Sequence, residues 1–210
     1  VNLAAGEGTL SGGEIVIKAG NSITGYGGAI TLESGHSETG ASGNIIMASP
    51  SAESSTGSVE ILTGNSVDSS GDVRLVTGQS DQGTAGSVAI VTGESSSEEN
   101  GADIMLNAGG SRSKTGGSIR ISSGSSNQLS SGKVSIESAA ASSISGFVGM
   151  RTGIANTNSG SVLLETGTSS LSSGDILVVA GDAGAKSGNI AIEAGSSTRG
   201  HGGSISLKAG

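Results

Sequence analysis

The chain has 210 residues, 39 of them glycine, and its only aromatic residues are Tyr26 and Phe147, so an ordinary core built on large side chains is excluded. The net charge is −8 and the basic residues form no stripe, which argues against nucleic acid as a partner. The chain has no Cys and no apolar run of roughly 18 residues, so we expect neither a disulfide framework nor a membrane span.

A unit of fourteen or fifteen residues, once sixteen, repeats from one end of the chain to the other. Each unit has an opening Gly, then three alternate positions that we call the first, second and third columns, and then a closing Gly. The exceptions are Ala102 at an opening position and Pro50 and Ala139 at closing positions. Gly13–Gly20 and Gly160–Gly167 are clear examples. After the incomplete first unit, the segments in chain order are 13–20, 28–35, 43–50, 57–64, 71–78, 86–93, 102–109, 117–124, 132–139, 146–153, 160–167, 174–181, 188–195 and 203–210.

The columns predict strands with one apolar face. The first column holds only Val or Ile, which favour extended backbone, and the second holds only aliphatic residues or Met. Residues two apart in a strand share a face, so these two columns form the predicted core ladder. Its clearest members are Ile15, Ile17, Ile30, Leu32, Val162, Leu164, Ile190 and Ile192.

The repeat predicts an all-β fold, a single parallel β-solenoid (β-helix) of about fifteen thin coils over residues 1–210. The third column admits only Ala, Ser or Thr, which indicates a narrow interior, and a small residue two positions after each closing Gly is interpreted as the opposite wall. The glycines are expected at corners with positive φ or close backbone approach. A disordered Gly/Ser linker is the alternative, but a linker has no reason to keep one apolar phase.

Charges at outward positions favour a regular stack. In parallel stacking, equivalent positions lie one unit apart, which places Glu137, Arg151 and Glu165 in one column. The same rule pairs Lys18 with Glu33, Glu60 with Arg74, and Glu193 with Lys208, and it brings no two like charges together in neighbouring units. Such pairs disfavour other registers.

The sequence offers one candidate contact surface and no catalytic, cofactor-binding or metal site. Leu62, Val76 and Val91 occupy one outward position on three consecutive units, as a lateral contact or as ordinary surface residues. The acidic link Glu94–Asn100 is either a weak cation site or a solvated loop, and His36 and His201 stand apart from other ligand types.

The motif in Ser42–Met47 and Ser187–Ser197 resembles the Gly/Ser-rich short-coil repeats of extracellular microbial and algal proteins and of viral fibres. The resemblance implies an extracellular or cell-surface structural element, not an enzyme. We expect the shaft of an appendage, wall filament or adhesin stalk, cut from a longer array or stacked end to end with other copies or fibre components. An ice-binding or carbohydrate-binding solenoid is the alternative, and a pectate-lyase-like enzyme is disfavoured because such coils are wider.

Overall fold

A computed structural model describes residues 1–96 and 99–209 and overturns the predicted β-solenoid. Within these residues the chain forms neither α-helix nor β-strand, and no ladder joins one unit to the next. The all-β fold class is therefore wrong, as is the description of the chain as a solenoid array. The physical reason is that a coil of this width has to bury its ladder against neighbouring coils, and residues 1–96 and 99–209 form no such stacking.

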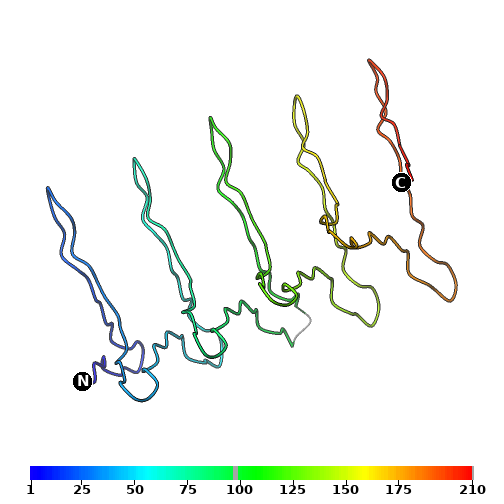
Figure 1. Cartoon of the computed structure of the whole chain (residues 1–210). Helices are drawn as coiled ribbons and strands as arrows, with labels where there is room; N and C mark the ends of the chain where they lie inside the picture. Colours follow the sequence, from blue (N-terminus) through cyan, green and yellow to red (C-terminus); the bar gives the residue numbers. More distant parts are fainter. Residues whose placement is uncertain (97–98, 210) are drawn as a thin grey trace. The chain divides into compact units, whose positions relative to one another are not determined.

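The repeat nevertheless has a structural counterpart. Figure 1 shows extended segments joined by links that reverse the chain, and every link bends. The bends lie at 9–10, 23–25, 38–40, 53–54, 67–68, 81–83, 99, 112–114, 127–129, 142–143, 156–157, 170–171, 184–185 and 198–200. Each bend falls between the closing position of one unit and the opening position of the next, so the period of the sequence is also the period of the backbone.

The chain divides into two units, Val1–Leu106 and Asn107–Gly210. Both are built in the same way, from extended segments and bent links. The accessible surface of the chain is 21719 Å². A folded monomer of 19.9 kDa exposes about 8,700 Å² and its extended chain about 29,000 Å². The chain therefore keeps most of its surface open to solvent.

The third column lies against the opening Gly of the following unit at the neck of most links, although not at Gly57. A Cβ added to Gly28 would lie 3.2 Å from Ala19 Cβ and 3.2 Å from Gly20 N. Only seven of the described residues are even half-buried, and six of them belong to the third column. They are Ala19, Ser34, Ser49, Thr152, Thr166 and Ala180, together with Ser37. The narrow space predicted at this column exists, but it is the neck of a link and not the interior of a coil.

The opening glycines are required for close approach and not for positive φ. In the described part of the chain no residue, glycine or otherwise, has positive φ, so the expected left-handed corners are absent. The closing Gly20 has open space where a Cβ would stand, which explains why Pro50 and Ala139 can replace a closing Gly. Ala102 replaces an opening Gly after the longest link, where Thr92 Oγ1 donates to the Ala102 carbonyl at 3.4 Å.

The neck closes through a backbone hydrogen bond mainly in the longer links. In all but one of the links in which the opening Gly lies eight positions after the closing Gly, the N–H of the opening Gly donates to the carbonyl of the closing Gly. Gly28 donates to Gly20 in this way at 2.9 Å. The same bond closes the necks at Gly43, Gly117, Gly132 and Gly203, and it also closes the shorter first link at Gly13. Link 78–86 has the longer spacing without the bond, and there the methyl group of Thr77 faces Gly86.

The small residue two positions after the closing Gly caps the bend. Ser22 Oγ accepts the N–H of Gly25 at 2.9 Å, and Ser37 Oγ accepts that of Gly40 at the same distance. Equivalent bonds from the residue three positions on are accepted by Ser80, Ser111, Ser126 and Ser197. Ser66 and Ser169 accept the N–H two positions on, at 3.3 Å. This Ser is present in all six links in which the opening Gly lies eight positions after the closing Gly. The four Ala at the same position lie in shorter links. These hydroxyls stabilise turns and do not form the wall of a coil.

Candidate functional site

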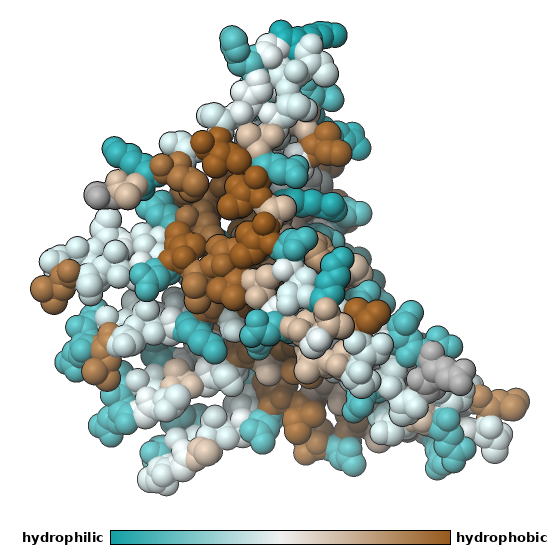
Figure 2. Space-filling view, turned by 90° about the vertical axis from the view of Figure 1, so that its right-hand side faces the viewer, coloured by the Kyte–Doolittle hydropathy of each residue, from teal (hydrophilic) through white to brown (hydrophobic). Residues whose placement is uncertain are grey.

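The predicted core ladder is exposed in a regular way. After Val1, residues of the first column are 48–59% exposed, with Ile15, Ile30, Val162 and Ile190 among them. Its second-column members, Ile17, Leu32, Leu164 and Ile192, are 64–68% exposed. The ladder therefore forms a repeated apolar strip that is open to solvent. Figure 2 shows hydrophobic side chains at the surface.

The backbone of the extended segments is open as well. The backbone–backbone hydrogen bonds of the described residues all lie at link necks, where the N–H of an opening Gly donates to the carbonyl of a closing Gly. Side-chain bonds to the backbone lie in the links or at their necks. Residues such as Ile15 and Ile17 thus present N–H and C=O groups beside an apolar face. This is the chemistry of an unpaired strand edge, which readily pairs with another chain.

The predicted lateral contact is accessible. Leu62, Val76 and Val91 are 74–82% exposed, more than any described first-column residue after Val1. All three lie in the unit Val1–Leu106. The exposure is compatible with a contact and equally with ordinary surface residues, so this contact stays a prediction.

Phe147 belongs to a feature that the sequence analysis missed. With Gly149, Met150 and Arg151 it lines an open hollow of about 410 Å³. A Cβ at Gly149 would lie 2.8 Å from Phe147 Cζ, so the aromatic ring covers this glycine. The available signal was a Gly at an outward position where other units carry side chains such as Val16 or Leu163. Phe147 is itself exposed and occupies an outward position, not a column of the strip.

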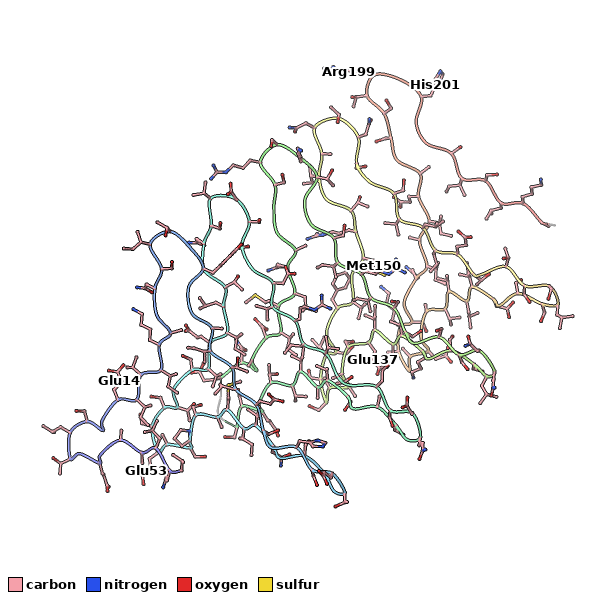
Figure 3. The ribbon with its side chains drawn as sticks, turned by 60° about the vertical axis from the view of Figure 1, so that its left-hand side comes forward. Glu14, Glu53, Glu137, Met150, Arg199 and His201 are labelled. Atoms are coloured by element: carbon pink, nitrogen blue, oxygen red, sulfur yellow. The ribbon has the colours of Figure 1, made fainter. Side chains whose placement is uncertain are left out.

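The described residues contain no group of three or more His, Cys, Asp or Glu that could hold a metal ion. Of the acidic link Glu94–Asn100, residues 97 and 98 lie outside the described part, and Ser95 Oγ donates to the Asn100 carbonyl at 3.2 Å. His36 is exposed in its own link. His201 shares a loop tip with Arg199 (Figure 3), whose guanidinium group offers a metal no ligand.

No protein family, curated protein or solved structure matches the chain. Among the described residues there is also no helix with the length and apolar character needed to cross a bilayer.

Proposed function

We propose that the chain is a non-catalytic structural element of an extracellular or cell-surface fibre, and that it acts by associating with copies of itself or with other fibre components. The observation that carries this proposal is the repeated strip, in which each segment leaves its aliphatic pair and its backbone edges open to solvent. Such a strip gains free energy only when another chain covers it.

Repetition suits this role better than it suits a reaction. A catalytic centre needs one distinctive cluster of groups, whereas the units here differ mainly in link length and outward charge. A filament contact gains from identical weak sites, because each added unit contributes its own burial. The resemblance to repeats of extracellular proteins points the same way, through the motif in Ser187–Ser197.

The ice-binding or carbohydrate-binding alternative has less support. A flat array of free hydroxyl groups would favour it, but the regular serines of the links accept hydrogen bonds from their own backbone. The third-column Thr152 and Thr166 are half-buried.

Assembly is tested by sedimentation velocity and electron microscopy over a range of protein concentrations, with far-UV circular dichroism on the same samples. We expect concentration-dependent particles and a strand signal that grows with them. A chain that stays monomeric, with an unchanged spectrum at the highest concentration, contradicts the proposal.

Substitutions locate the contact. A variant with Ile15→Thr, Ile17→Thr, Ile30→Thr and Leu32→Thr removes two units of the strip. A fully buried aliphatic side chain contributes about 1.5–3 kcal/mol, and these side chains are 48–66% exposed before assembly. We expect the concentration needed for assembly to rise at least about tenfold per unit changed. Val16→Thr and Ile46→Thr, at outward positions, are the matched control and should change it less.

A further inference from the structure

We infer that the partner of the exposed strip is a second copy of this chain, parallel to the first and displaced by one repeat. This inference rests on the proposed function and adds its partner and register. The charges at outward positions alternate between neighbouring units, although no ladder within the described residues brings those units together.

Copies aligned without displacement would repel each other, because every charge would meet its own kind. Displacement by one repeat replaces these contacts with opposite pairs and creates no like pair in the extended segments. The pairs are Lys18 with Glu33, Glu60 with Arg74, Glu137 with Arg151, Arg151 with Glu165, and Glu193 with Lys208.

Larger displacements between the two copies bring like charges together. Two repeats leave one opposite pair, Asp103 with Lys133, and create three like pairs: Asp72 with Asp103, Glu137 with Glu165, and Glu165 with Glu193. Three repeats place Arg74 against Arg120, although they also form three opposite pairs. Like charges directly opposite each other on paired strands destabilise the pair, so the outward residues favour the single-repeat displacement.

Parallel alignment follows from the columns. It places β-branched residues against β-branched residues and the small third column against another small third column, whereas antiparallel alignment would set the bulky first column against the small third. The available area is ample, because the chain exposes 21719 Å² where a compact monomer of its mass exposes about 8,700 Å². Obligate interfaces bury roughly 2,000–5,000 Å².

Introduced cysteines measure the displacement directly, since the chain has no Cys of its own. Paired parallel strands lie about 4.8 Å apart, within the Cα separation that a disulfide accepts. Glu60→Cys and Arg74→Cys chains are purified in reduced form, mixed and then assembled together. The assemblies are treated with a mild oxidant, and the linked peptides are identified by mass spectrometry. We expect the mixture to give the 60–74 cross-link, and each variant alone to give little.

The control mixture combines Glu60→Cys with Ala89→Cys, two repeats away in the same column, and should also give little. A dominant 60–60 or 60–89 link overturns the inferred register while leaving assembly, and hence the proposed function, intact. Assembled particles that form no cross-link in any mixture overturn the inference too. If no variant and no parent chain assembles, both proposals are wrong.

Charge reversal gives an independent result. Arg151→Glu makes three successive acids in one column, so the concentration needed for assembly should rise at least about fivefold, and added salt should reduce the effect. The triple variant Glu137→Arg, Arg151→Glu, Glu165→Arg restores alternation and should recover assembly. Arg199→Glu, which changes the net charge by the same amount on a loop tip (Figure 3), is the matched control. Equal effects of Arg151→Glu and Arg199→Glu, or failure of the triple variant to recover, contradict the inferred displacement.

Discussion

The two glycines that bound a link should respond differently to the same substitution. At Gly28 an added Cβ would lie 3.2 Å from Ala19 Cβ and 3.5 Å from the Gly20 carbonyl oxygen, which accepts the Gly28 N–H at 2.9 Å. At Gly20 nothing lies within 4 Å of the added atom. Gly28→Ala should therefore force the neck open, whereas Gly20→Ala should fit.

The expected size follows from the bond that is lost. A hydrogen bond of this kind contributes about 0.5–1.5 kcal/mol net, so Gly28→Ala should speed hydrogen exchange of the residue 28 amide by about two- to twelvefold. Gly20→Ala should leave this exchange unchanged or slow it, because alanine restricts the unfolded chain and no positive φ has to be kept at this position.

The assay is amide hydrogen exchange followed by NMR at a concentration below assembly, with the amide of Gly43 as an internal reference in the next neck. If Gly28→Ala leaves the exchange of residue 28 unchanged, close approach does not explain the opening glycine. If Gly20→Ala accelerates it equally, the two glycines are equivalent and the description of the neck is wrong.

Two further predictions concern the links. Ser22→Ala removes the acceptor of the Gly25 N–H, so the Gly25 amide should exchange about two- to twelvefold faster, while Ser22→Thr, which keeps a hydroxyl, should change it little; equal effects of the two would exclude the hydroxyl as the cause. Thr77→Ala should allow the Gly86 N–H to donate to the Gly78 carbonyl, as Gly28 does to Gly20, and this would slow hydrogen exchange of the Gly86 amide. Ala19→Thr should open the neck at Gly28 and speed exchange of its amide. An unchanged Gly86 amide in the Thr77→Ala chain would show that the β-branched methyl group is not what holds that neck open.

The sequence by itself determined the period, the limits of each extended segment and the positions of the links. Periodicity is local information: the opening and closing glycines mark where the chain bends, and every described link does bend there. The sequence also identified the narrow third column, because Ala, Ser or Thr at one position throughout indicates a steric limit. It could not show what sets the limit, which is the opening Gly of the next unit, as Ala19 and Gly28 illustrate.

Only the tertiary structure decided whether the apolar face is covered within the chain. Alternation of residues such as Ile15 and Ile17 indicates that one face seeks burial, but it carries no information on whether the partner is the next unit or another molecule. Hydrophobic burial is non-directional, so one pattern serves either arrangement. In the structure these side chains are exposed to solvent, and the short-range hydrogen bonds form in the links and at their necks. The roles of the link serines and of Gly149 beneath Phe147 likewise depend on contacts that become visible only in three dimensions.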